Sequence, residues 1–219
     1  MKKRLEGLNE AYQKLSSIER LDRANRDFKR ILITSSFGTT SAILFEQFKL
    51  AGIKDYTVHF VNTGFLFEET MRYKDTLSAH YGFKVHEIRP ANWRFELTEN
   101  KKLWETNPDL CCAIKKIEPL EEVMKDHDLW ISGIMAWQNS HRKNQHVFTV
   151  KHDLLKFHPL IDLSRAYTAE FYRENPHLKH PMQAMGYDSV GCTHCTSKGE
   201  GRNGRWSKNG EKTECGLHL

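Results

Sequence analysis

The feature that most constrains the fold is an alternation of short apolar runs with longer helical segments. The run Ile31-Leu32-Ile33-Thr34 precedes a helical stretch that ends at Gly52, and the run 56–61 precedes a helix from about 67 to 81. A further alternating run follows at 84–88. Strands that alternate with helices form a parallel sheet with helices on both faces. The spacing therefore predicts an α/β fold.

Further predicted elements follow in the rest of the chain, and together they divide the chain into three parts. Residues 129–134 read as another strand, 147–150 and 154–157 as a hairpin, and 165–175 as a helix. Before the first strand, apolar residues recur every three or four positions and predict a helical segment packed on the outside. From Gly186 onward apolar residues become rare, so this part cannot build its own core. We expect a helical segment at 1–28, an α/β nucleotide-binding domain at 29–185, and a tail at 186–219.

Small-residue turns follow two of the predicted strands. Ser35-Ser36-Phe37-Gly38 follows the first, and Asn62-Thr63-Gly64 follows the second. In parallel sheets, ligands bind beyond the carboxyl ends of the strands. A strand, a small-residue loop and a helix also point backbone N–H groups at an anion. The first loop lacks the lysine of a triphosphate-binding loop, and serine-rich turns often only cap helices.

The five cysteines form two close pairs and one single residue. Cys111 and Cys112 are adjacent, Cys192 and Cys195 are three residues apart, and Cys215 lies near the end of the chain. Four thiolates in two pairs suit zinc or an iron–sulfur cluster. The alternative for the first pair is two buried, inert thiols, but two lysines follow it closely and would stabilise thiolates. Cys215 is left as a nucleophile on a tail that we expect to be flexible.

Composition excludes several classes of protein. The net charge is +5, with Lys and Arg spread among Asp and Glu, and the dense basic stripe of a nucleic-acid binder is missing. No apolar run approaches the roughly 20 residues that span a bilayer, and the basic start leads into no signal peptide. We therefore expect no membrane association and a cytoplasmic location, where free thiols persist.

Arg202 and Arg205 carry guanidinium groups that suit phosphate or sulfate.

These motifs together resemble the assimilatory sulfonucleotide reductases, and among them the iron–sulfur adenylyl-sulfate (APS) reductases. The resemblance covers nearly the whole chain from about Leu32. Its most specific part is the combination of a double cysteine, a CxxC pair and a terminal ECGLH. The matching stretches are Ser35–Gly38, Thr63-Gly64 with Leu66-Phe67 and Glu69-Thr70, Cys111–Leu120, Gln138, Arg142, Gly186–Cys195, Arg202-x-x-Arg205-Trp206 and Glu214–His218.

The resemblance implies an adenine-nucleotide α-hydrolase-like (PP-loop) fold and a [4Fe–4S] cluster on Cys111, Cys112, Cys192 and Cys195. It implies that Cys215 attacks the sulfur of APS and that thioredoxin, or a glutaredoxin-like protein, releases sulfite from the resulting S-sulfonate. His218 is expected to assist Cys215, and the chain is compatible with a homo-oligomer. The substrate-binding residues expected are Ser35, Ser36, Phe37, Gly38, Asn62, Thr63, Gly64, Lys116, Arg142, Arg202 and Arg205.

The chain departs from the family pattern at four places. Thr39-Thr40-Ser41 replaces Ala-Glu-Asp, Asn62 replaces Asp, Met135-Ala136 replaces a pair of arginines, and Lys115 stands where Arg is common. These differences affect the choice between APS and its 3′-phosphorylated form, PAPS. The alternatives are a cluster-containing PAPS reductase, an ATP-dependent sulfurtransferase, and a zinc-stabilised binding module.

Overall fold

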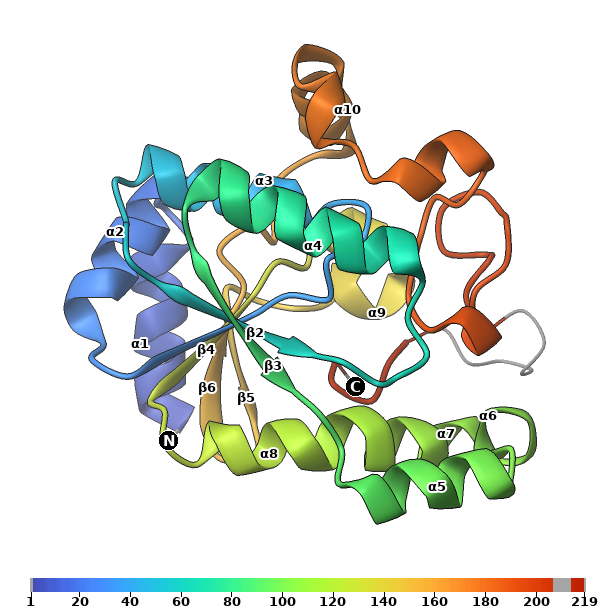
Figure 1. The fold of residues 1–219 in the computed structure, drawn as a ribbon. Helices are drawn as coiled ribbons and strands as arrows, with labels where there is room; N and C mark the ends of the chain where they lie inside the picture. The colour runs from blue at the N-terminus through green and yellow to red at the C-terminus, as the bar shows by residue number, and fades with distance from the viewer. Residues whose placement is uncertain (1, 207–213, 219) are drawn as a thin grey trace.

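The computed structural model describes residues 2–206 and 214–218. Its centre is a six-stranded sheet in the order β3-β2-β1-β4-β6-β5 (Figure 1). All neighbouring strands are parallel except β5 and β6, which pair antiparallel. The strands are β1 (Ile31–Thr34), β2 (Thr57–Val61), β3 (Lys84–Ile88), β4 (Leu129–Ser132), β5 (Phe148–Lys151) and β6 (Leu154–Phe157). The predicted α/β fold and the terminal hairpin are confirmed.

Helices cover both faces of the sheet. In Figure 1, α3 and α4 lie above it and α5, α7 and α8 lie below it. The expected N-terminal helical segment contains two helices, which join the main core through Tyr12 and Leu21. The α-helices are α1 (Lys2–Tyr12), α2 (Ser17–Asp27), α3 (Ser41–Leu50), α4 (Glu68–Tyr81), α5 (Asn92–Asn100), α6 (Leu103–Thr106), α7 (Pro108–Cys112), α8 (Glu118–Met124), α9 (Ser140–Lys143) and α10 (Arg165–Glu174).

A continuous helical run carries the first cysteine pair. Helix α7 passes through a π-helical turn, η1 (Ala113–Ile117), into α8. Pro119 cannot donate to the carbonyl four residues earlier, and a widened turn relieves the clash of its ring with that carbonyl. Side chains four residues apart share a face of a helix. Cys111 therefore shares a face with Lys115, and Cys112 shares a face with Lys116.

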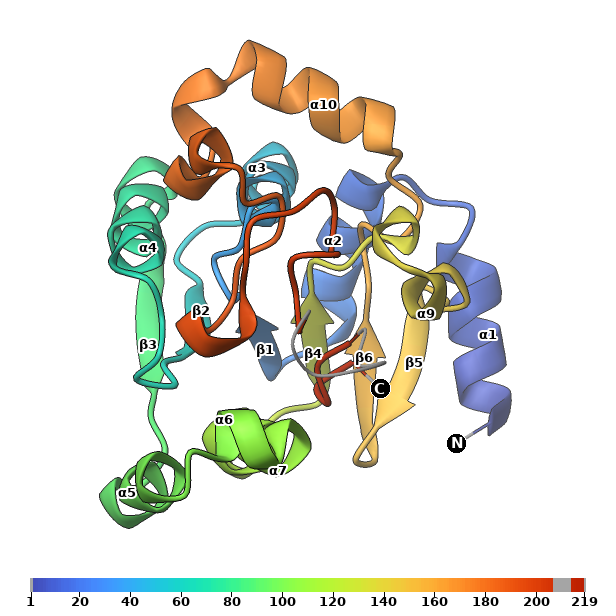
Figure 2. The same ribbon diagram turned by 90° about the vertical axis from the view of Figure 1, so that its right-hand side faces the viewer.

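The chain after α10 crosses the carboxyl edge of the sheet. It is held by short backbone bridges, among them Leu66 with Cys192 and Thr196 with Arg205. Short 3-10 turns supply the remaining regular structure: η2 (Ala136–Gln138), η3 (Pro176–Leu178), η4 (Pro181–Met185) and η5 (Thr193–Cys195). Both views place the end of the chain beside this edge (Figures 1 and 2). The described tail residues, 214–218, lie against the body.

Candidate active site

A cavity of about 230 Å³ opens at the carboxyl edge of the sheet. The serine loop after β1 and the turn after β4 line it. Its lining also includes Lys116, Arg142, Arg202 and Arg205. Cys215 and His218 reach the same cavity from the tail. Ser35 and His218, which are 183 positions apart in the sequence, therefore share one pocket.

The serine loop has a tightly fixed shape. The Phe37 N–H donates to Ser35 Oγ at 3.0 Å, and Phe37 has a φ of 48°. Its ring is fully buried and packs edge-on against Phe60, with ring centroids 5.2 Å apart. Ser35, Ser36 and Gly38 line the cavity, whereas Phe37 does not. Phe37 thus serves as the loop's anchor in the core.

Two threonines that depart from the family pattern hold neighbouring segments in place. Thr39 Oγ1 donates to the Asp188 carbonyl at 2.7 Å, and Gln138 Nε2 donates to Thr40 Oγ1 at 3.1 Å. Gln138 Oε1 in turn accepts from the Met135 N–H at 3.1 Å. Neutral hydrogen bonds therefore join the loop after β1 to the turn after β4 and to the segment around Asp188.

The turn after β2 faces the cysteines instead of the cavity. Thr63 Oγ1 lies 3.3 Å from Cys192 Sγ. Gly64 has a φ of +78°, and a Cβ there would lie 2.1 Å from Phe95 Cε2. Asn62 Nδ2 donates to Glu87 Oε1 at 2.9 Å. None of the three turn residues lines the cavity, so the structure separates them from the other expected substrate contacts.

The two cysteine pairs lie close to one another although they are far apart in sequence. Cys111, Cys112 and Cys192 are buried, and Cys195 is partly buried. Burial raises the pKa of Cys111 to about 11, and the charges of Cys192 and Cys195 act in the same direction. The described part of the chain holds no group of three or more His, Cys, Asp or Glu residues that could hold a metal ion.

Lys115 is a buried cation beside these thiols. It is 1% exposed, and its Nζ lies 3.8 Å from the ring centroid of Phe65 and 3.3 Å from that of Phe95. Nζ has no hydrogen-bond partner among the described residues. Burial lowers the pKa of Lys115 to about 8, and the charge of Cys111 opposes that effect. A desolvated ammonium of this kind requires a nearby anion.

An aromatic wall, which we define as Phe65, Phe95, Trp104 and His194, covers the same region. The rings of Trp104 and His194 stack with centroids 4.1 Å apart and an interplanar angle of 10°. Phe65 packs edge-on against both of them. Phe65 and Phe95 also contact the Lys115 ammonium, so the wall adjoins the segment that follows Cys111. Phe65, Phe95, Trp104 and His194 were not singled out from the sequence.

Cys215 has the surroundings of an activated thiol. A hydrogen bond with Cys112 lowers its pKa well below the ordinary value, against the effect of burial. The positive charges of Lys116 and Arg205 act in the same direction. Burial alone would lower the pKa of Lys116, but the thiolate charges around it raise the pKa above its usual range. Because Cys112 is also an expected cluster ligand, the charges of Lys116 and Arg205 are the part of these surroundings that favours the Cys215 thiolate, the reactive form, whether or not Cys112 binds a metal.

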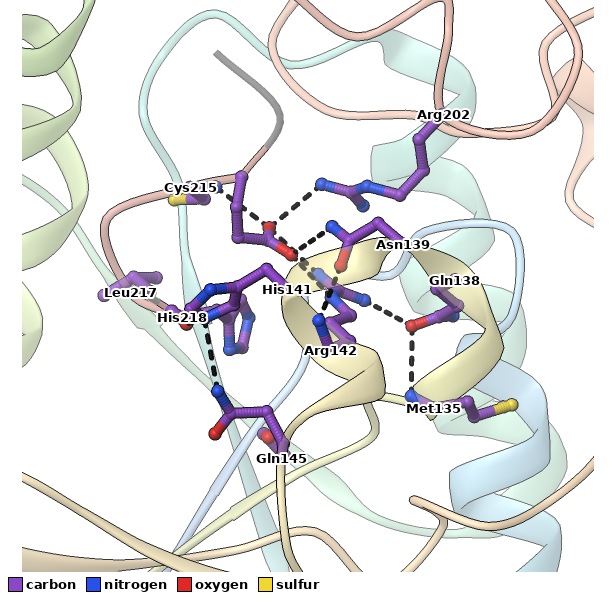
Figure 3. Close-up of polar contacts among 12 residues, drawn as sticks. Met135, Gln138, Asn139, His141, Arg142, Gln145, Arg202, Cys215, Leu217 and His218 are labelled. Atoms are coloured by element: carbon purple, nitrogen blue, oxygen red, sulfur yellow. Dashed lines mark hydrogen bonds and ion pairs between the residues drawn. The ribbon is translucent and has the colours of Figure 1, made fainter. Parts of the chain in front are cut away.

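Glu214 connects the tail to two of the expected substrate cations. It is 1% exposed, and its carboxylate accepts from Arg142 Nε at 2.6 Å and from Arg202 Nη2 at 2.9 Å. Figure 3 shows Arg142, Arg202 and Asn139 converging beside Cys215. Burial alone would raise the pKa of Glu214, but the arginines lower it to about 2. Glu214 belongs to the ECGLH motif, but the sequence alone did not indicate this role.

Lys156 is the other functional candidate that the sequence did not reveal. Its Nζ lies 2.9 Å from His218 Nδ1 and donates to the Leu217 carbonyl at 2.6 Å. Burial lowers the pKa of His218 well below its ordinary value, and the charge of Lys156 adds to this effect. His218 is therefore neutral and does not supply a charge to Cys215. A lysine inside the apolar run 154–157 was the available signal, because charged residues are rarely buried without a partner.

Solved structures place the fold in the adenine-nucleotide α-hydrolase-like class. The structure of phosphoadenylyl-sulfate (PAPS) reductase from Candida auris matches with a TM-score of 0.76 and 23% identity, covering 90% of this chain and 98% of that one. The NH3-dependent NAD synthetase of Campylobacter jejuni matches with a TM-score of 0.52 and 11% identity, covering 78% of this chain and 73% of that one. At these identities the similarity shows the fold alone.

The chain belongs to the phosphoadenosine phosphosulfate reductase family, whose domain matches residues 30–198. It is 35% identical to the adenosine 5′-phosphosulfate reductase of Mesorhizobium japonicum, covering 97% of this chain and 86% of that protein. It is 33% identical to adenosine 5′-phosphosulfate reductase 2 of Bacillus subtilis, covering 87% of this chain and 84% of that protein. The expected family is confirmed. No described helix has the length and apolar character needed to cross a membrane.

Proposed function

We propose that this chain reduces APS to sulfite and AMP, and that a dithiol protein of the thioredoxin or glutaredoxin type supplies the electrons. The observation that carries the proposal is the position of Cys215. It lines the same cavity as the serine loop, and the charges of Lys116 and Arg205 act on its thiol. The curated relatives named as adenosine 5′-phosphosulfate reductases support the choice of substrate.

The charges that line the cavity favour APS over PAPS. Four cations, Lys116, Arg142, Arg202 and Arg205, line the cavity together with the carboxylates of Asp188 and Glu214 and the Cys215 thiolate, so the net charge of these groups is positive by one. The phosphosulfate of APS carries one negative charge on its phosphate and one on its sulfate. PAPS adds a further phosphate and would need additional cations. Among the described residues, the cavity has no surplus cation for a 3′-phosphate, which favours APS.

Two steps account for the chemistry. The Cys215 thiolate attacks the sulfur of APS, the bond between that sulfur and the bridging oxygen breaks, and AMP leaves with the electron pair. This leaves an S-sulfonate on Cys215. A thiolate of the dithiol partner then attacks Cys215 Sγ, sulfite leaves with the electron pair of the S–S bond, and a mixed disulfide forms. The second thiol of the partner resolves it, so that the partner is oxidised and Cys215 is restored.

The protein's own groups assist the first step. Lys116 and Arg205 offset the negative charge of the transferred group, which is the largest electrostatic demand of the reaction. The serine loop and the N-terminus of α3 face the cavity, where N–H groups suit the nucleotide phosphate. His218 is neutral, so it can donate or accept a hydrogen bond near the reacting atoms without adding charge.

We further propose that Cys111, Cys112, Cys192 and Cys195 hold a [4Fe–4S] cluster. Four cysteine thiolates are the ligand set that such a cluster takes. Four thiolates make the cluster anionic, and the buried Lys115 supplies charge of the opposite sign. If bound there, the cluster would add its charge near Lys115 and would hold the two cysteine segments together. We expect the protein in the cytoplasm, where these thiols stay reduced.

Mass spectrometry of the protein mixed with APS in the absence of reductant tests the nucleophile. We expect one added SO₃ group, located on the peptide that contains Cys215. Cys215→Ser should keep its iron and form no adduct. An adduct on another cysteine, or sulfite release by Cys215→Ser at the parent rate, would show that the assignment is wrong.

Initial rates with APS and with PAPS test the substrate. We expect a kcat/KM for APS at least about tenfold above that for PAPS, because an unpaired phosphate costs more than one charge-assisted hydrogen bond. The reverse order would identify a PAPS reductase. Activity that requires ATP and forms no adduct would identify a sulfurtransferase, and stoichiometric zinc without iron would support the binding module.

A further inference from the structure

The carboxylate of Glu214 has more hydrogen-bond donors than an ordinary ion pair. Besides Arg142 Nε and Arg202 Nη2, it accepts from Arg142 Nη2 at 3.1 Å, from Asn139 Nδ2 at 2.9 Å and from the Cys215 N–H at 2.9 Å. Five N–H groups therefore surround two buried oxygens. This arrangement resembles the way in which proteins surround a bound sulfate or phosphate.

The donors come from segments that are distant from the tail. Asn139 caps α9 and Arg142 lies within α9, whereas Arg202 lies in the loop that follows the second cysteine pair. Glu214 joins these segments to residues 214–218. Since the Cys215 N–H binds the same carboxylate, Glu214 also fixes the backbone from which the reactive thiol projects.

Arg142 and Arg202 were expected to bind the substrate, and both line the cavity. With the tail in place, however, the guanidinium groups of both residues are directed at Glu214. Arg205 differs from them. Its Nη1 donates to the Val190 carbonyl at 2.8 Å, and its Nε has no hydrogen-bond partner among the described residues. The four cations of the cavity therefore form two pairs. Arg142 and Arg202 bind the tail through Glu214, whereas Lys116 and Arg205 lie near the Cys215 thiol.

We propose that Glu214 is a positioning residue that acts as an internal oxyanion: it anchors Cys215 in the cavity by occupying Arg142 and Arg202, and small tetrahedral oxyanions compete with it for these arginines. Binding of such an anion then releases residues 214–218 from the body. By linkage, the anchored tail weakens oxyanion binding by the same factor. The inference concerns the site of the proposed function, but its tests use no nucleotide, so either can fail without the other.

Hydrogen exchange of the backbone amides 214–218, measured on the protein as purified, tests the anchor. In Glu214→Gln the carboxylate charge is lost while the side-chain shape is kept, so we expect exchange about 10- to 100-fold faster than in the parent protein. Exchange reports release of the backbone and does not depend on the ionisation of the thiol. Equal exchange rates in the two proteins would overturn the anchor.

Inorganic sulfate tests the competition. Sulfate should accelerate exchange at 214–218 in the parent protein relative to sodium chloride of equal ionic strength, and it should have no further effect in Glu214→Gln. Unchanged or slower exchange with sulfate in the parent protein would overturn the competition. This measurement needs no variant, so it decides the question even if Glu214→Gln fails to fold.

Asp162→Asn provides a matched control. Asp162 accepts two hydrogen bonds from the buried Arg20, at 2.6 and 2.7 Å, away from the cavity. This variant also breaks an arginine–carboxylate pair, but it should leave exchange at 214–218 unchanged. Equal acceleration in Asp162→Asn and Glu214→Gln would show that any loss of stability releases the tail, and would overturn the specific role of Glu214.

Discussion

Single residues at this site have roles that their chemical type does not reveal. Arg142 and Arg202 are the kind of residue that binds substrate anions, yet they hold a carboxylate of the chain itself. His218 is the kind of residue that charges near neutral pH, yet burial keeps it neutral. The surroundings of each side chain, including its nearest charges and its exposure to water, determine its role.

Acid should remove the stabilisation that Glu214 provides. Its pKa is about 2 in the folded protein, below its ordinary value of 4.5, so its contribution is present above pH 4.5 and is lost as the pH falls toward 2. The shift corresponds to about 3 kcal/mol in the free energy of unfolding. Urea unfolding should show the parent protein more stable than Glu214→Gln at pH 6, with the difference shrinking near pH 3. A difference that is independent of pH would contradict this prediction.

Lys156 should support activity through the tail. Lys156→Met removes the donor to the Leu217 carbonyl and the contact with His218, so we expect the rate of AMP release in a single turnover to fall about 10- to 100-fold. Binding of AMP itself should change little. If Lys156→Met releases AMP at the same rate as the parent protein, the prediction is contradicted.

The pH dependence of stability offers a second test of Lys156. Burial lowers its pKa to about 7 from an ordinary value of 10.5. The penalty for burying the charged form is therefore complete below pH 7 and is relieved as the pH rises toward 10.5. Compared with Lys156→Met, the parent protein should gain stability between pH 7 and 10 in urea unfolding. An equal response of both proteins to pH in this range would be inconsistent with a depressed pKa.

At the scale of elements, the turn after β2 and helix α5 form one unit with the cysteine segments. Gly64 allows Phe95 of α5 to approach the backbone, and Phe95 in turn covers the Lys115 ammonium. The π-helical turn η1 brings that ammonium to the same face as Cys111. The Thr63-Gly64 turn therefore packs against the cysteine segments and does not line the cavity.

Gly64→Ala tests this unit. The new Cβ would meet the Phe95 ring and force it away from Lys115, so we expect a loss of about 1–3 kcal/mol in the free energy of unfolding and a lower iron content per chain. Gly82→Ala is the matched control, because Gly82 also has a positive φ, +73°, with open space around its Cβ position. In that variant, only the strain of a positive φ at alanine should lower the free energy of unfolding, and the iron content per chain should stay unchanged. Full iron content in Gly64→Ala would argue against the unit.

At the scale of the whole molecule, the fold brings positive charge to one edge of the sheet. The cavity receives cations from η1, from α9 and from the segment after the second cysteine pair. No single stretch of the sequence is dense in basic residues, and the positive site forms only when these segments meet. This explains how a chain of modest net charge can bind a doubly charged anion.

Salt should weaken the capture of substrate. Because attraction between a positive cavity and an anionic nucleotide is screened by ions, kcat/KM for APS should fall as sodium chloride rises from 0.05 to about 0.5 M. The turnover number at saturating APS should change less. A kcat/KM that is independent of salt would show that the net charge of the cavity does not guide binding.

The sequence by itself determined the α/β fold, the location of the candidate site at the carboxyl edge, and the division of the cysteines into two close pairs and one single residue. These features follow from local periodicity, from strand polarity and from residue type. Only the tertiary structure decided which side chains meet across the chain. Arg142 and Glu214 are 72 residues apart, and Thr63 and Cys192 are 129 apart. Such contacts depend on how the elements pack and on which charges packing excludes from water, and no local pattern encodes that.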